Sequence, residues 1–254
     1  MTYKNVAIKA TREAGKILRN NFFNKVKAES KGKHDLVTIT DRASEKIILK
    51  ILKSYYPAHN FVAEESGSSR NRSKYTWYID PLDGTSNFVT GNPFFSVSIG
   101  LALENEIILG VVFNPLTNEL YFAEKGKGSY LNDQRLKTSL TNKLSDALIS
   151  SAYSKKESDI RRGLKTIEKL ALNSRKVVVN FSPALVLCNI ARGRLDAIVD
   201  NGTTPEDHAA GSLILTEAGG KIQNYNSKNW DVREIGITAT NGKLRNSIIN
   251  LIKK

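Results

Sequence analysis

Six consecutive residues of this chain, Asp80-Pro81-Leu82-Asp83-Gly84-Thr85, have types and a spacing that could do chemistry. The two carboxylates lie three positions apart, directly after the apolar stretch Trp77-Tyr78-Ile79, and carboxylates held so closely repel each other unless a cation lies between them. Mg2+ is a hard cation that takes oxygen ligands in octahedral array. The glycine and threonine that follow would place backbone N–H groups at a helix start, where phosphate oxygens bind. A metal site beside a phosphate site indicates phosphoryl chemistry.

The same residues also make a good turn. Pro-Leu-Asp-Gly is favourable turn chemistry in its own right, and a short motif of this kind often only ends a strand. The rest of the chain has to decide between a structural turn and a metal site.

Other acidic residues also lie at the ends of predicted elements. Asp41 follows an extended run and opens a helix, Glu64 and Glu65 follow a short strand, and Asp207 lies in the first turn of a helix. Each has a structural explanation as well: Asp41 can cap its helix, the glutamates can form a solvated loop, and Asp207 completes a capping box with Thr204. Together they predict carboxylates that converge at one edge of the fold, where ligand sites usually lie.

The elements that must position these residues follow from hydrophobic periodicity. Apolar residues three and four apart predict helices over residues 6–22 and 41–55. Extended segments are predicted at residues 36–40, 61–63, 95–103, 107–113 and 120–124. Two tight reversals join the last three segments, which predicts an antiparallel meander.

After the polar residues 138–146, strands and helices alternate. Strands are predicted at 148–152, 177–179 and 197–199, and helices at 160–172, 184–191 and 204–218, before a final strand and helix. Ser182 and Pro183 suit the N-cap and first position of the helix at 184–191. We therefore expect a single domain, 1–254, of two packed lobes with helices layered on sheets. Lobe 1–140 would carry the metal and phosphate site, and lobe 141–254 would bind the substrate.

Composition limits the possible classes. The chain has 254 residues, enough for a large core, and no run of about 18 apolar residues that would predict a membrane helix. A single cysteine, Cys188, excludes an internal disulfide and fits a reducing cytoplasm, and the N-terminus lacks signal-peptide features. The net charge of +13 suits anionic substrates or nucleic acid, but Lys and Arg are spread without a block of five or six.

In order and spacing, these motifs resemble the inositol monophosphatase family over nearly the whole chain. The segments that carry the resemblance are 35–41, 64–66, 77–88, 93, 96–99, 207–211 and 216–220. The resemblance implies an α/β (α+β) layered sandwich of the αβαβα, sugar-phosphatase type. It also implies hydrolysis of phosphate monoesters that depends on two or three Mg2+ ions.

The resemblance also assigns roles to individual residues. The implied metal ligands are the side chains of Glu64, Asp80, Asp83 and Asp207 and the backbone carbonyl of Leu82. Asp41 and Thr85 would orient the attacking water, with Glu64 nearby, and the N–H groups of Gly84 and Thr85 would hold the phosphate.

Departures from the family pattern lie mainly where the organic part of the substrate would bind. Glu206 stands where the family usually has Trp, Asp200 matches a substrate-facing Glu that is one methylene longer, and Ser182 stands in an altered segment. Ser182 and Asp200 are the implied substrate-binding residues. The metal-binding motifs are intact, so phosphatase chemistry is the firmer prediction. Inositol 1-phosphate is the first candidate substrate, and fructose 1,6-bisphosphate and 3'-phosphoadenosine 5'-phosphate remain alternatives.

Two partners follow from the resemblance and the charge. The family implies a homodimer. Bacterial relatives are linked to RNA metabolism, so the net charge of +13 also fits RNA or an acidic protein partner, either beside catalysis or in place of it.

Overall fold

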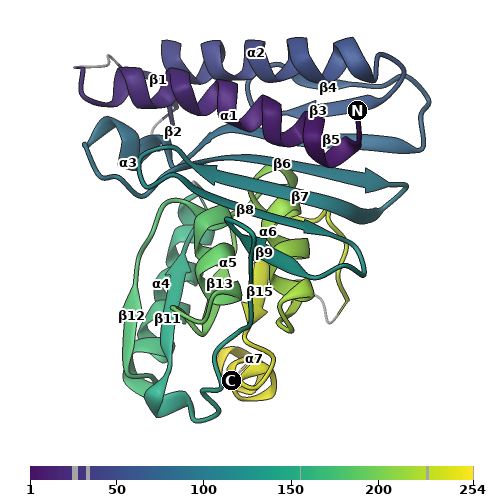
Figure 1. Ribbon diagram of the computed structural model, residues 1–254. Helices are drawn as coiled ribbons and strands as arrows, with labels where there is room; N and C mark the ends of the chain where they lie inside the picture. Colours follow the sequence, from purple (N-terminus) through teal and green to yellow (C-terminus); the bar gives the residue numbers. More distant parts are fainter. Residues whose placement is uncertain (25–27, 33–34, 155, 227–228, 254) are drawn as a thin grey trace.

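The computed structural model describes residues 1–24, 28–32, 35–154, 156–226 and 229–253. Three layers of helices alternate with two β-sheets (Figure 1). This arrangement confirms the predicted layered α/β fold. Part of the polar stretch 25–34, including His34, lies outside the described residues.

The first layer consists of α1 (Tyr3–Phe22) and α2 (Ile39–Tyr55), which pack against each other and against one face of the larger sheet. Both helices bury an apolar stripe, as their periodicity predicts. The start of α2 differs from the prediction. Strand β2 (Asp35–Thr38) stops at Thr38, which is the N-cap, so Asp41 is the third residue of the helix rather than its opening residue.

The larger sheet has eight strands in the order β10-β9-β8-β7-β6-β5-β3-β4. Its strands are β3 (Asn60–Ala63), β4 (Gly67–Ser69), β5 (Tyr75–Asp83), β6 (Ser96–Leu103), β7 (Glu106–Asn114), β8 (Glu119–Glu124), β9 (Ser129–Leu131) and β10 (Gln134–Arg135). Strands β6 to β8 form the predicted antiparallel meander, β5 adds to it by pairing antiparallel with β6, and β3 runs parallel to β5. The sequence did not predict β4, β9 or β10, nor β1 (Ala28–Gly32), which pairs with β2.

The middle layer consists of α5 (Pro183–Ala191) and α6 (Pro205–Glu217), which pack between the two sheets. Two glycines let α6 approach the larger sheet closely. A Cβ at Gly110 would lie 2.3 Å from the carbonyl oxygen of Ala210, and one at Gly100 would lie 2.9 Å from the Cβ of Ala209. The absence of side chains at these glycines therefore sets the depth of α6.

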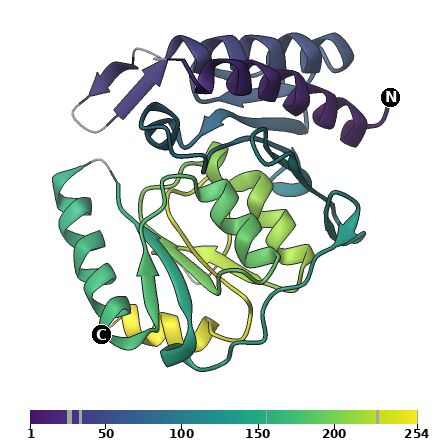
Figure 2. The ribbon, with the colours of Figure 1, turned by 60° about the vertical axis from the view of Figure 1, so that its left-hand side comes forward.

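The smaller sheet has five strands in the order β12-β11-β13-β15-β14. They are β11 (Leu148–Ala152), β12 (Lys176–Val178), β13 (Ala197–Asp200), β14 (Lys221–Asn224) and β15 (Ile237–Thr240). Helices α4 (Glu157–Asn173) and α7 (Arg245–Lys253) form the outermost layer on this sheet (Figure 2). Among the described residues, no helix has both the length and the apolar character needed to cross a membrane.

Candidate active site

Three aspartates from two distant parts of the chain meet at one point. One carboxylate oxygen from each of Asp80, Asp83 and Asp207 lies within 4.8 Å of the other two. Asp80 and Asp83 come from the last residues of β5, and Asp207 comes from the first turn of α6. The turn predicted after Ile79 is instead a continuation of β5 with an irregular register against β6 between Asp80 and Asp83.

The first two of these carboxylates are buried close to negative charge. Asp80 and Asp83 are 2% and 1% exposed. Burial raises the pKa of Asp83 to about 7, hydrogen bonds from Ser182 and Ser96 counteract the rise, and the charge of Asp207 adds to it. Burial and then the charge of Glu64 raise the pKa of Asp80 well above its ordinary value.

No cationic side chain in the described part of the chain forms an ion pair with Asp80 or Asp83. Buried carboxylates that repel one another are normally stabilised by a cation, and three converging carboxylate oxygens are the donor type that Mg2+ prefers. The residues present therefore fit a hard divalent cation.

A hydroxyl links Asp41 to the same strand end. Thr85 Oγ1 lies 3.0 Å from Asp41 Oδ1 and 3.2 Å from the backbone carbonyl oxygen of Leu82. The other oxygen of Asp41, Oδ2, accepts a hydrogen bond from the backbone N–H of Thr38 at 2.9 Å, which makes Asp41 part of a capping box. Burial raises the pKa of Asp41, although its hydrogen bonds with Thr38 and Thr85 lower it.

Gly84 lies between the strand end and the short helix α3 (Thr85–Val89). Its φ of +98° is a left-handed conformation that glycine adopts without strain, and the position is crowded by backbone atoms of Phe94 and Phe181. The N–H groups at a helix start have no intrahelical acceptor. Gly84 and Thr85 are both partly exposed, and their contact with phosphate through these N–H groups stays a prediction.

Glu64 and Glu65 occupy a tight turn between β3 and β4. Glu64 is exposed, and its charge raises the pKa of Asp80, which places it beside the three aspartates although it is not one of the converging trio. The backbone N–H of Glu65 donates to the carboxylate of Glu45 at 2.8 Å. Glu45 is 4% exposed and anchors the turn from α2.

The two residues predicted to bind substrate, Ser182 and Asp200, have different surroundings. Ser182 is the N-cap residue of α5 and Pro183 is its first residue, as predicted, but the Ser182 hydroxyl donates a hydrogen bond to the carboxylate of Asp83 and makes no capping hydrogen bond with the helix. Asp200 ends β13, is buried, and has a pKa raised to about 6, chiefly by burial and also by the charge of Asp207. Asp200, which belongs to the smaller sheet, is therefore close enough to Asp207 to be affected by its charge.

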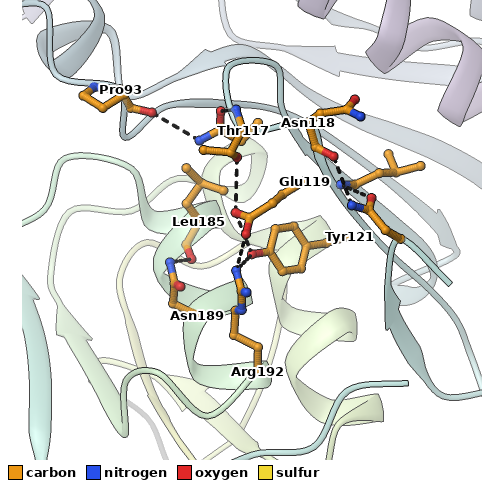
Figure 3. A network of polar contacts seen from close by, with 11 residues as sticks. Pro93, Thr117, Asn118, Glu119, Tyr121, Leu185, Asn189 and Arg192 are labelled. Atoms are coloured by element: carbon orange, nitrogen blue, oxygen red, sulfur yellow. Dashed lines mark hydrogen bonds and ion pairs between the residues drawn. The ribbon is translucent and has the colours of Figure 1, made fainter. Parts of the chain in front are cut away.

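A polar network fixes the other end of α5. Arg192, which follows α5, donates to Glu119 of β8 at 2.5 Å and to the hydroxyl of Tyr121 at 2.7 Å (Figure 3). Both partners in this ion pair are mostly buried. Since Ser182 and the backbone N–H of Ala184 contact Asp83 at the start of α5, the helix is held at both ends.

His208 is adjacent to Asp207 but points elsewhere. Its Nε2 lies 2.9 Å from the carbonyl oxygen of Val232, so Nε2 carries the proton, and Nδ1 accepts from the hydroxyl of Thr203 at 3.1 Å. Burial lowers its pKa to about 4. The ring is therefore neutral at pH 7 and fastens a loop.

The sequence did not predict three residues that hold the site in place. Ser44 donates to the carbonyl oxygen of Pro81 at 2.8 Å, Ser96 donates to Asp83 at 2.8 Å, and Glu45 holds the glutamate turn. The signal for two of them was present in α2, because its buried stripe turns from apolar to polar at Asp41, Ser44 and Glu45. A buried stripe with polar residues at one end indicates a site at that end.

The model of the "Inositol monophosphatase family" matches residues 2–254. The chain belongs to this family. It is therefore a phosphatase of the phosphoric monoester hydrolase class, as the motifs predict.

Individual relatives agree over their full length. Inositol monophosphatase 2 of Solanum lycopersicum is 37% identical over 99% of this chain and 98% of its own. The Nus factor SuhB of Haemophilus influenzae is 34% identical over 98% of this chain and 95% of its own. The solved structure of an IMPase from Thermotoga maritima has a TM-score of 0.91 at 30% identity, covering 100% of this chain and 97% of that one.

Proposed function

We propose that this protein hydrolyses a phosphate monoester in a Mg2+-dependent reaction, with inositol 1-phosphate as its first candidate substrate. The observation that carries the proposal is the convergence of Asp80, Asp83 and Asp207, each with a carboxylate oxygen within 4.8 Å of the other two. Asp80 and Asp83 are buried, and the negative charges of the cluster repel one another. The 37% identity to a tomato inositol monophosphatase supports this substrate over other phosphate esters.

The proposed metal ligands are the carboxylates of Glu64, Asp80, Asp83 and Asp207 and the carbonyl oxygen of Leu82. Two or three bound Mg2+ ions would neutralise the phosphate, activate the attacking water and stabilise the departing alkoxide. Ser96 and Ser182 hold Asp83 in place by donating to its carboxylate, so the ligand is oriented before any cation binds.

Asp41 and Thr85 would handle the proton of the attacking water. A hydroxyl has a single proton, so when Thr85 donates it to Asp41, at 3.0 Å, its lone pairs are available to accept a hydrogen bond from water. This orients the water oxygen toward phosphorus, and Asp41 can receive the proton that passes through Thr85. Glu64 would assist, and its electrostatic effect on the pKa of Asp80 supports this role.

The N–H groups of Gly84 and Thr85 would hold the phosphate oxygens opposite the carboxylates. The buried carboxylate of Asp200 would accept hydrogen bonds from hydroxyl groups of the polyol. Ser182 would contribute through Asp83, because its own hydroxyl proton is already donated to that carboxylate.

Phosphate release from a substrate panel tests the proposal. The panel is inositol 1-phosphate, fructose 1,6-bisphosphate, 3'-phosphoadenosine 5'-phosphate and glycerol 2-phosphate, each with Mg2+ and with EDTA. We expect Mg2+-dependent turnover, fastest with inositol 1-phosphate. Preference for another compound would replace the substrate but keep the mechanism. Near-wild-type turnover by Asp83→Asn at saturating Mg2+ would overturn the mechanism, because losing even an outer-shell partner of a metal costs about 10–100-fold.

We also infer a cytoplasmic homodimer. The single buried cysteine, Cys188, is consistent with a reducing compartment, and the match to the family spans the whole chain. Light scattering during gel filtration tests the assembly, and a monomer at micromolar concentration would contradict it. Cell fractionation tests the location.

Association with RNA or an acidic protein is a second candidate function. A relative that is 34% identical is described as a Nus factor, and the net charge of +13 favours acidic partners. Binding to structured RNA at two salt concentrations tests this function. Affinity that falls steeply with salt supports it, and no affinity at either concentration rejects it.

A further inference from the structure

A hollow lies in the outermost layer, on the far side of the smaller sheet from α6. It encloses about 400 Å³ between α4, α7 and the end of β14. The lining residues are Arg162, Lys165, Thr166, Lys169, Gln223, Tyr225, Asn226, Ile249, Ile252 and Lys253. Asp80, Asp83 and Asp207 are not among them, because these residues lie where β5 meets the middle layer. We call this hollow the outer pocket.

The outer pocket is lined by four basic side chains and no acidic one. Arg162 forms an ion pair with Asp159 at 2.9 Å, but within the described ranges Lys165, Lys169 and Lys253 form no ion pair. The lining therefore carries an excess of positive charge, which favours an anion.

The acids of α4 form no ion pair with these lysines among the described residues. Glu157 pairs with Arg161 and Asp159 pairs with Arg162, both in the first turns of the helix. Lys165 and Lys169 follow one and two turns later on the face that lines the hollow. Glu168, three residues after Lys165, is exposed and does not line the outer pocket, and it forms no ion pair in the part of the chain that the structure describes.

The polar and aromatic lining is held in place by the protein itself. The hydroxyl of Thr166 lies 3.0 Å from that of Tyr225, and the guanidinium of Arg162 lies 5.3 Å from the centre of the Tyr225 ring. Gln223 accepts a hydrogen bond from Arg245 at 3.0 Å, and both Thr166 and Gln223 are buried. The walls are therefore formed before any ligand arrives, which lowers the ordering cost of binding.

The lining also includes an apolar part. Ile249 and Ile252 project from α7 at a spacing of three, on the same face of the helix. A volume of about 400 Å³ falls in the range of small-molecule sites, about 300–1,000 Å³, and exceeds what a lone phosphate ion would fill.

We propose that the outer pocket binds a small organic phosphate with at least two negative charges and a flat or apolar body, of the nucleoside diphosphate class. The phosphates contact Lys165, Lys169 and Lys253, and the body lies against Ile249, Ile252 and the Arg162–Tyr225 pair. Because the outer pocket is separate from the three aspartates, this ligand binds without being hydrolysed, and the proposal does not depend on the phosphatase activity.

Calorimetric titration of the full chain tests the proposal. The probes are ADP, inorganic pyrophosphate and adenosine, in EDTA at about 150 mM salt. EDTA removes divalent cations, so the aspartates repel anions and no turnover occurs. The test variant is Lys165→Glu with Lys169→Glu. The control is Lys46→Glu with Lys50→Glu, which changes the charge equally, at the same spacing of four, on exposed residues of α2.

We expect ADP to bind more tightly than pyrophosphate and adenosine not to bind measurably. The test variant should weaken ADP binding at least about tenfold, since charge-assisted hydrogen bonds are lost, while the control stays within about twofold. Equal weakening in both variants, or no ADP binding at millimolar concentration, would overturn the proposal. A short single-stranded RNA that binds at least tenfold more tightly than ADP, and is lost in the test variant alone, would replace the small ligand with RNA.

Discussion

Asp83 is held in an environment that opposes its ionisation. Its folded pKa of about 7 lies well above the value of about 3.9 for an unfolded aspartate, so the folded state binds the extra proton between these values. An acid with a raised folded pKa contributes stability below its unfolded pKa, and that contribution is lost as pH rises through the folded pKa. The free energy of unfolding of the metal-free protein should therefore decrease as the pH rises from about 4 to 7.

This gives a prediction for thermal unfolding. In EDTA, the Tm should fall by several degrees between pH 5 and pH 8, and Asp83→Asn should flatten that fall because an amide does not ionise. Mg2+ should raise the Tm of the wild-type protein more at pH 8 than at pH 5. Differential scanning fluorimetry measures both effects. Because His208, with its pKa of about 4, opposes the fall below about pH 6.5, the comparison with Asp83→Asn decides, and a pH dependence of Tm that is the same in both proteins would contradict the assignment.

Thr85 offers a matched pair of substitutions. Thr85→Val keeps the shape and removes the hydroxyl that bridges Asp41 and Leu82, so we expect kcat to fall at least about 100-fold. Thr85→Ser keeps the hydroxyl and should stay within about tenfold of wild type. Steady-state kinetics at several Mg2+ concentrations distinguishes proton transfer from metal binding. We expect neither substitution to alter the Mg2+ concentration needed for half-maximal activity. Equal losses in both variants would indicate packing rather than proton transfer.

The sequence predicted which acidic side chains would meet, while their roles in binding and catalysis stay predictions. Asp80, Asp83 and Asp207 do converge, and Asp41 does meet Thr85. The hydrogen bond from Ser182 to Asp83 was not predictable, because residues 99 positions apart meet only through the packing of α5. Local patterns show where elements end, and tertiary packing decides which ends meet.

At the scale of elements, α5 lies between the two sheets and is held by side-chain contacts at both ends. Its start supports Asp83, and the residue after its end, Arg192, is fixed by Glu119 and Tyr121. Arg192→Met removes one partner of a mostly buried ion pair and leaves Glu119 without its counter-charge. We expect a loss of about 2 kcal/mol in unfolding free energy.

Chemical denaturation measures that loss. The double variant Arg192→Met with Glu119→Gln should recover part of the stability, because no unpaired charge is then left. A double variant as unstable as the sum of the single changes would show that the two residues act independently.

Long periodic elements were predicted closely, and short ones were missed. The strand Leu148–Ala152 matches its predicted range, and α1 matches within three residues at its start. Strands β4, β9 and β10 have two or three residues each, too few for an alternating pattern to emerge. The boundary at Thr38 was misplaced because Ile39 and Thr40 have high strand propensity, while the capping box at Thr38 decides the helix start.

At the scale of the whole molecule, the depth of α6 connects packing to the site. Gly110 allows α6 to lie directly on β7, and α6 carries Asp207 toward β5. Gly110→Ala should push the helix outward, because its Cβ would lie 2.3 Å from a backbone oxygen that cannot rotate away. We expect a loss of about 3 kcal/mol in stability and weaker Mg2+ binding.

A matched control is Gly126→Asn. Gly126 has a φ of +75° and no atom within 4 Å of its added Cβ, and asparagine tolerates that conformation. Its stability and Mg2+ affinity should remain close to wild type. Unchanged Mg2+ affinity in Gly110→Ala would show that the site does not depend on the depth of α6.

The layered architecture was predictable because alternating patterns and family motifs both indicated it. The partition into lobes 1–140 and 141–254 stays a prediction, although the larger sheet uses strands from residues 60–135 and the smaller sheet uses strands from residues 148–240. The strand order within the smaller sheet was not predictable, since β15 inserts between β13 and β14 and only long-range packing selects that position.

The two capping boxes give two of the acidic residues a role in folding. Asp41 and Asp207 each accept a backbone N–H, from Thr38 and Thr204, and so stabilise the starts of α2 and α6. A descendant that abandoned hydrolysis would still be selected to keep them as folding residues. Asp83 belongs to neither capping box, and burial raises its pKa to about 7. In family members that have lost hydrolytic activity, we therefore expect substitutions at the position of Asp83 before substitutions at the positions of Asp41 and Asp207.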